Sequence, residues 1–214
     1  MPGPHDRIIV DAAKSALGPL GFRRKGRSRL WLADHGWWLT IVEFQPSAWS
    51  KGGYLNVAAH WLWSEKGHLS FDFGDRAADF EEYISDEQFA VAASRLADRA
   101  ACEARRLAQV FIPLSATADA LLGAARVMHE QGRISWMTYH AGVAAGLVNR
   151  SAEATEMFER ITSGSAPPGS NLHPAAERMA RIVGEPSGFR RKVSALIERQ
   201  RRALGLTTLD ASPV

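Results

Sequence analysis

Strand-length runs of large apolar side chains, separated by short turn sequences, fill the chain from residue 29 to residue 73. Three of these runs are rich in Trp, Leu, Ile and Val, which favour β-strands: 29–33, 37–45 and 54–63. In a fourth run, 69–73, Leu and Phe alternate with polar residues at the period of two that is typical of a strand. Gly, Pro, Ser and Asp cluster between the runs, as turns require. The sequence therefore predicts a four-stranded antiparallel meander.

Helical periodicity lies on both sides of this meander. Residues 6–17 repeat apolar positions at helical spacing, and from Ser85, which has capping-box spacing with Gln88, an apolar stripe continues to Phe111. Later helices are expected near 117–131, 135–147, 151–162 and 188–204. We therefore expect an α+β fold in which an N-terminal helix and a long helix pack on the sheet. Residues 1–112 would form this domain, and residues 113–214 a helical region packed on it.

Composition argues against several classes of protein. The longest apolar-and-glycine run, 141–148, is much shorter than the roughly 20 residues that a membrane helix needs. The N-terminus lacks the apolar stretch of a secretory signal, and a single cysteine, Cys102, cannot form an internal disulfide. The seven histidines show no close two-ligand spacing, so we expect no metal site and no cofactor. These features predict a cytoplasmic protein without membrane contact.

Several short motifs resemble those of a known family. They are the segment Gly21-Phe22-Arg23-Arg24-Lys25-Gly26, the aromatic strand that follows it, the strand exit Glu43-Phe44-Gln45-Pro46-Ser47 and the strand Gly53-Tyr54-Leu55-Asn56-Val57. Together they resemble the bacterial domain-of-unknown-function family 4304 over roughly residues 5–110. The resemblance implies a bacterial origin and names no activity. A weaker similarity, to one tetratricopeptide helix pair, rests on Gly142, Ala154 and Phe158; with one copy we expect an ordinary antiparallel helix hairpin.

Tryptophan is the strongest compositional anomaly, since six of the seven tryptophans lie between Trp31 and Trp63. Apolar residues fall on both faces of the expected sheet: Leu30, Leu32, Trp38, Val42 and Phe44 on one, and Trp31, Leu39 and Ile41 on the other. Either the later helices cover the second face, or part of it is a binding surface. We expect a surface that binds a protein partner, because aromatic residues and Arg dominate such interfaces. The expected binding residues are Arg23, Arg24, Lys25, Trp37, Trp49, Trp61 and Trp63.

The basic cluster Arg23–Arg29 supports an alternative, nucleic-acid binding. Cations beside tryptophans are the mixture that attracts phosphates and stacks bases, and the last helix adds further arginines. The net charge of +3 is small, however, although the isoelectric point is about 9.3. A solvated loop that enters the sheet explains the same cluster.

A second alternative is a small-molecule enzyme centred on His60 and Asp72. If Trp61 and Trp63 share the core face with the apolar residues of run 69–73, His60 and Asp72 face each other across the hairpin. Asn56 would then lie on the same face as His60, with Glu43 nearby. One His and one Asp specify no reaction, so we favour a structural polar pair, and whether the chain is an enzyme stays open.

Overall fold

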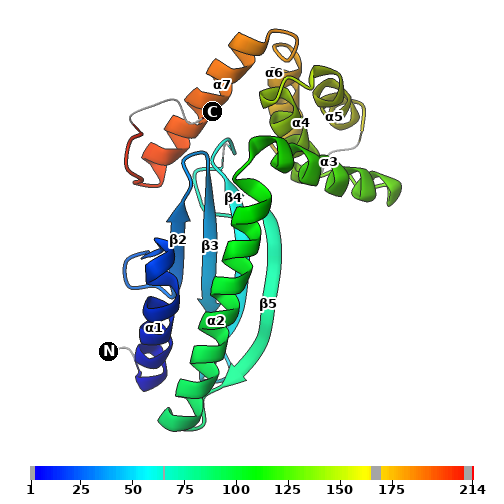
Figure 1. The fold of residues 1–214 in the computed structure, drawn as a ribbon. Helices are drawn as coiled ribbons and strands as arrows, with labels where there is room; N and C mark the ends of the chain where they lie inside the picture. The colour runs from blue at the N-terminus through cyan, green and yellow to red at the C-terminus, as the bar shows by residue number, and fades with distance from the viewer. Residues whose placement is uncertain (1–2, 65, 165–169, 210–213) are drawn as a thin grey trace. The chain divides into compact units, whose positions relative to one another are not determined.

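The computed structural model describes residues 3–64, 66–164, 170–209 and 214, and its fold is α+β (Figure 1). The helices are α1 (Pro4–Leu17), α2 (Asp86–Phe111), α3 (Leu114–Glu130), α4 (Trp136–Leu147), α5 (Ser151–Ser163), α6 (Leu172–Ala180) and α7 (Pro186–Ala203). The strands are β1 (Arg23–Arg24), β2 (Leu30–Asp34), β3 (Trp38–Gln45), β4 (Gly52–Trp61) and β5 (Phe73–Glu82). A short 3-10 turn, Gly18–Leu20, follows α1. The α+β class and the helical C-terminal half are confirmed, but the sheet has five strands, not four.

The chain forms two compact units. Unit 1 contains residues 1–60 and 70–108, and unit 2 contains residues 61–69 and 109–214. The sequence predicts a single boundary after residue 112. In the structure, unit 2 also includes residues 61–69, which begin at the last residue of β4. Trp61 and Trp63 therefore belong to the helical unit.

The sheet of unit 1 is antiparallel in the order β1-β2-β3-β4-β5. The β2–β3 hairpin closes with the His35 amide donating to the Trp38 carbonyl, and Gly36 at φ 88° occupies the turn. Trp31 is consequently opposite Val42, and Leu30 is opposite Glu43. The face assignment made from the sequence is wrong, because a turn displaced by one residue moves every side chain of a strand to the other face.

The last strand also differs from expectation. β5 begins at Phe73, where the expected strand ends, and Phe71 in the preceding segment is 45% exposed. β5 pairs with β4 through two register shifts, one on each side of Leu55. Such bulges, together with the acidic residues of β5, protect a sheet edge from adding further strands. The irregular edge explains why the sequence of β5 shows no clear alternation.

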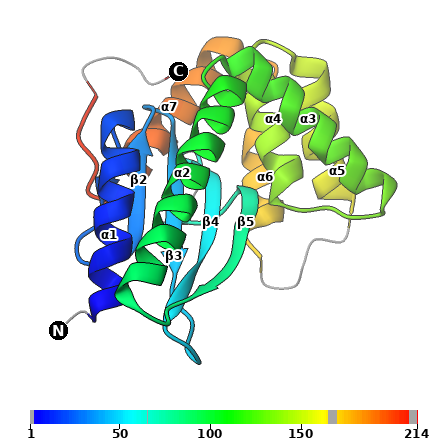
Figure 2. The same cartoon turned by 60° about the horizontal axis from the view of Figure 1, so that its bottom comes forward.

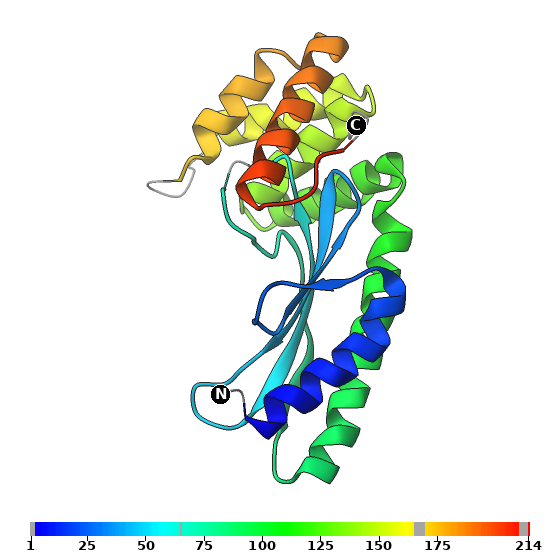
Figure 3. The ribbon, with the colours of Figure 1, turned by 90° about the vertical axis from the view of Figure 1, so that its left-hand side faces the viewer.

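Helices α1 and α2 lie on the same face of the unit 1 sheet (Figures 2 and 3). Gly53 of β4 points to this side, since a Cβ added there would lie 3.4 Å from Ile9 of α1. Arg29, 9% exposed, ties α1 to the sheet: it donates to the Asp6 carboxylate and to the Gly52 carbonyl at 2.6 Å. Burial raises the pKa of Asp6, but hydrogen bonding and attraction from Arg29 outweigh it, so this pKa lies below its ordinary value.

Helix α4 is the centre of unit 2, since nearly all its residues are buried. A Cβ added to Gly142 would lie 2.7 Å from the Phe158 ring of α5, and one added to Gly146 would lie 2.5 Å from the Phe189 ring of α7. These two glycines let the neighbouring helices approach closely. The helix hairpin expected from Gly142 and Phe158 is therefore present as α4 and α5. Helix α6 is absent from the sequence prediction. Residues 163–170 are rich in Gly, Ser and Pro, which predicts an exposed loop or a hinge, and part of this segment lies outside the described residues.

Candidate functional site

Most of the tryptophans proposed as a binding surface are buried. Trp37 is 7% exposed, and Trp61 and Trp63 are fully buried. Trp31 and Trp38 lie on the helix-covered face of the sheet, at 5% and 0% exposure. The expectation that Trp37, Trp61 and Trp63 form an exposed aromatic surface is therefore wrong, because packing uses these side chains as core.

Trp61 and Trp63 build an aromatic cluster within unit 2. Their rings stack with centroids 5.4 Å apart, and Phe111 meets Trp61 edge-on at 5.0 Å. The Trp63 indole donates to His140 Nδ1 at 3.1 Å, so the polar atom of this buried ring has a partner. Trp136 lies beside His140. Trp61 and Trp63 are therefore core residues of unit 2.

The helix-free face of unit 1, defined by Leu30, Leu32, Glu43, Gln45 and Asn56, has a polar centre. Asn56 Nδ2 donates to Glu43 Oε2 and to Gln45 Oε1, both at 3.0 Å. The sequence correctly places Asn56 near Glu43, and the structure adds Gln45. Leu30 and Leu32 are half-buried here. The surface thus combines a fixed polar group with accessible apolar atoms.

Two further residues complete this polar centre, and neither was expected. Arg76 of β5 is opposite Asn56, and its guanidinium lies 4.0 Å from the Tyr54 ring centroid. Arg76 also donates to Gln45 Oε1 at 3.3 Å. The bulged pairing of β4 with β5 determines this placement, so no periodic signal in the sequence could have indicated it.

The loop between β3 and β4 exposes the remaining tryptophan of unit 1. Trp49 is 95% exposed, and the Ser47 hydroxyl accepts hydrogen bonds from the Trp49 and Ser50 amides at 3.1 and 3.4 Å. This Ser turn holds the loop in a defined conformation. Figure 3 shows the loop on the helix-free side of the sheet. Trp49 is the one expected aromatic binding residue that solvent reaches.

The basic turn, residues 23–28, lies on the same side of the sheet (Figure 3). Arg24 is tied to its own turn, since it donates to the Ser28 carbonyl at 2.6 Å and to the Arg27 carbonyl at 2.7 Å. Arg23 and Lys25 are exposed, and Arg23 is opposite Leu32 of the helix-free face. Of the cluster Arg23–Arg29, Arg29 is buried with Asp6, so fewer cations are free for a ligand than the sequence suggests.

His60 and Asp72 do lie together, with His60 Nδ1 3.0 Å from Asp72 Oδ2. Their side chains are 0% and 1% exposed. Ser70 Oγ donates to Asp72 Oδ1 at 2.8 Å and lies 3.2 Å from the same His60 nitrogen. In a nucleophilic triad Ser and Asp occupy opposite nitrogens of the imidazole, which is not the arrangement here. Burial and geometry favour a structural pair that fixes residues 70–72 on β4.

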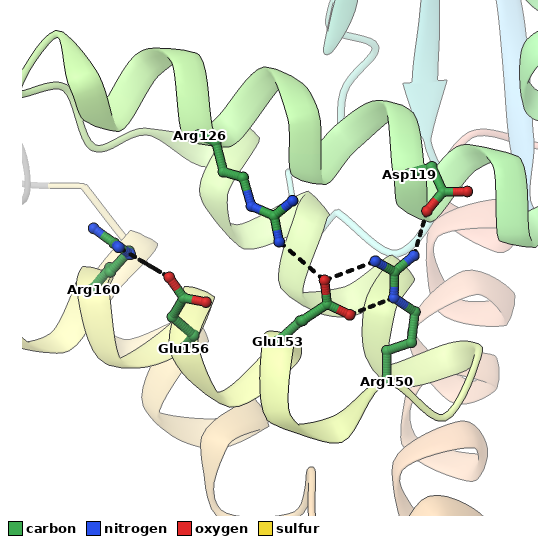
Figure 4. Close-up of polar contacts among 6 residues, drawn as sticks. All are labelled: Asp119, Arg126, Arg150, Glu153, Glu156 and Arg160. Atoms are coloured by element: carbon green, nitrogen blue, oxygen red, sulfur yellow. Dashed lines mark hydrogen bonds and ion pairs between the residues drawn. The ribbon is translucent and has the colours of Figure 1, made fainter.

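Unit 2 carries a network of charged side chains between α3 and α5 (Figure 4). Its members are Asp119, Arg126, Arg150 and Glu153. Arg150 donates to Asp119 and to both oxygens of Glu153, and Arg126 donates to Glu153 at 3.0 Å. The hydrogen bond from Arg150 is the main reason that the pKa of Glu153 lies below its ordinary value. The four residues link α3 to α5, and a separate ion pair joins Glu156 to Arg160 within α5.

Comparison of the chain with family models, curated proteins and solved structures finds no match. The resemblance to family 4304 therefore stays a prediction. Within the described ranges, no group of three or more His, Cys, Asp or Glu side chains is placed to hold a metal ion. No single helix among the same residues is long and apolar enough to cross a membrane.

Proposed function

We propose that the chain is a binding protein that recognises a protein partner through the helix-free face of unit 1. The observation that carries the proposal is Trp49, whose side chain is 95% exposed on a loop fixed by Ser47. Burying a large apolar side chain stabilises a protein by roughly 1.5–3 kcal/mol, and a partner that covers the Trp49 ring would gain this free energy on binding. Tryptophan is also among the residues most enriched at the centres of protein interfaces.

The chemistry of the partner follows from the charges on the side of the sheet that carries the Trp49 loop. Arg23 and Lys25 are exposed at the basic turn, and Arg76 is exposed on the face itself. Glu43 is the carboxylate of the polar centre, and Asn56 already donates to it. We therefore expect a protein segment whose apolar side chains cover Trp49 and whose carboxylates face the cations.

The geometry does not favour nucleic acid at this face. Bases need open aromatic rings for stacking, but Arg76 covers the ring of Tyr54. Glu43 at the polar centre would also repel phosphates. Trp49 is the one large aromatic side chain on this side that is fully open to solvent. These features support a protein partner over a single strand of DNA or RNA.

Selection of displayed peptides on the full-length chain tests the proposal. We expect selected peptides to be rich in apolar residues and in Asp or Glu, and we expect Trp49→Ala to weaken them by about 30-fold, as for an interface hot spot of roughly 2 kcal/mol. Ile84→Ala is the matched control, because Ile84 is 74% exposed elsewhere in unit 1. Peptides that bind the Trp49→Ala variant as tightly as the wild type would refute the proposal.

A further inference from the structure

The positive charge of the chain is concentrated on its last helix. Helix α7 contains six Lys or Arg residues and one Glu, a formal charge of +5, whereas the whole chain carries +3. The rest of the chain is therefore slightly acidic, at −2. The high isoelectric point, about 9.3, thus describes one helix and not the protein surface in general. Basic residues clustered along a helix are the usual electrostatic footprint of nucleic-acid binding.

The cations of α7 separate into two groups. Arg190 donates to the Leu147 carbonyl at 2.9 Å, and Arg201, 3% exposed, donates to the Thr207 carbonyl. These two arginines belong to the structure of unit 2. The second group is exposed and occupies one arc of the helix, which it shares with the exposed Glu198: Arg191, Lys192, Arg199 and Arg202.

Three cations of this exposed arc, the basic face of α7, are open to a ligand. Within the part of the chain that the structure describes, the side chains of Arg191, Lys192 and Arg202 form no hydrogen bond or ion pair. A hollow of about 360 Å³ lies beside the first two, lined also by Ile182, Glu185, Gly188 and Ala195. Cations without partners cost little to transfer from solvent to a phosphate.

The apolar side of α7 indicates which polyanion fits. Phe189, Val193, Leu196 and Ile197 are buried within the protein. A helix that binds in a membrane interface needs such an apolar side for the acyl chains, and α7 has none left. The basic face spans residues 191–202, or about 16 Å along the helix axis. Phosphates of one strand of a duplex repeat about every 3.4 Å along the axis, so about five lie opposite this length.

We propose that the basic face of α7 binds the phosphate backbone of nucleic acid, independently of sequence. Each neutralised phosphate releases condensed counterions, so the three cations Arg191, Lys192 and Arg202 give a slope of about −2.7 for the logarithm of affinity against the logarithm of salt concentration. Affinity would then fall about 40-fold between 50 and 200 mM salt. The role is separate from peptide binding at Trp49, and neither proposal rests on the other.

Fluorescence anisotropy with a labelled 20-base-pair duplex, measured over a salt series on the full-length chain, tests the proposal. Replacing Arg191 and Lys192 by Ala should bring the slope about 1.8 closer to zero, since two contacts are lost. The control replaces Lys14 and Arg105 by Ala, because both are exposed in unit 1 and their loss removes the same net charge. We expect the control to keep the wild-type slope and affinity.

Three results would overturn the proposal. One is binding that does not depend on salt, and another is an equal loss of slope in the control variant, which would show a non-specific effect of net charge. The third is binding to phosphatidylserine vesicles as tight as binding to the duplex, which would indicate a general anionic surface as the ligand. Circular dichroism of both variants verifies that folding is retained. Measuring one strand of the duplex alone shows whether the second strand contributes to the affinity.

Discussion

Gly142 and Gly123 allow the packing of unit 2 to be measured with one chemical change at two positions. Both glycines lie inside helices, where replacing Gly by Ala gains about 1 kcal/mol of helix propensity. At Gly123 on α3, an added Cβ meets nothing within 4 Å. At Gly142 on α4, it would lie 2.7, 2.9 and 3.1 Å from three atoms of the Phe158 ring. The gain in helix propensity is therefore the same at both sites, and only the steric clash of the added Cβ differs.

Overpacking a filled core costs about 1–3 kcal/mol, which exceeds the propensity gain. We therefore expect Gly123→Ala to raise the unfolding free energy by about 1 kcal/mol and Gly142→Ala to lower it by about 1 kcal/mol. For a chain of this length the difference of about 2 kcal/mol separates the two melting temperatures by about 4–8 °C. Urea denaturation and thermal melting, both followed by far-ultraviolet circular dichroism, measure it.

Phe158→Leu provides the control for the proposed cause. The smaller side chain leaves room for the new Cβ, so Gly142→Ala should cost at least 1 kcal/mol less in the Phe158→Leu background than in the wild type. Equal stabilisation by Gly123→Ala and Gly142→Ala would refute the reasoning. It would mean that α5 moves away from α4 at little cost and that the glycine is not required for their close approach.

Three further substitutions test buried contacts of unit 1 by urea denaturation. Asp6→Asn should lower stability by about 2 kcal/mol at pH 7, because Arg29 stays buried without its carboxylate. Since the folded pKa of Asp6 lies below its unfolded value, this contribution is complete above the unfolded pKa and is lost as the pH falls through the folded pKa, so the difference between variant and wild type should shrink as the solution is acidified. Asp72→Asn should cost about 3 kcal/mol and leave peptide and duplex binding unchanged if its pair with His60 is structural; lost binding with retained stability would contradict that. Gly74→Ala should cost more than 2 kcal/mol, because φ is +123° and the new Cβ would lie 2.5 Å from a backbone oxygen of β4; a smaller loss would show that β5 shifts easily.

Local signals in the sequence were sufficient for much of the fold. Apolar periodicity identified α1 and the long α2, and Ser85 caps α2 as expected, its hydroxyl accepting from the Gln88 amide at 3.2 Å. Helix α6 was missed because it has only nine residues and an interior Pro174. β5 was misplaced because its bulges interrupt the period of two on which strand prediction depends. Long regular elements are encoded locally, whereas short or irregular ones depend on tertiary contacts.

The candidate site was less predictable, because it depends on which face each side chain occupies. Placing the β2–β3 turn one residue too early reversed the faces and put Trp31 on the wrong one. The pair of His60 with Asp72 survived, because it requires only that β4 and the segment before β5 adjoin. The hydrogen bond from Arg76 to Gln45 depends on the shifted register of β4 and β5, which no pattern in the sequence predicts. Face assignments in a sheet are therefore only as accurate as the turn that sets the register.

Tryptophan content and net charge mislead in opposite ways in this chain. Tryptophan is abundant in the sequence, but burial leaves Trp49 as the one nearly fully exposed indole of unit 1. Net charge is small, but α7 carries +5 while the remainder carries −2. The number of tryptophans does not show how many are buried. The net charge does not show how the charged residues are distributed among the helices. The two surfaces lie in different units and are proposed to bind different ligands, so we expect substitutions at Trp49 and at Arg191 to have additive effects on binding. A measured coupling above about 1 kcal/mol between them would instead indicate that one ligand engages both units.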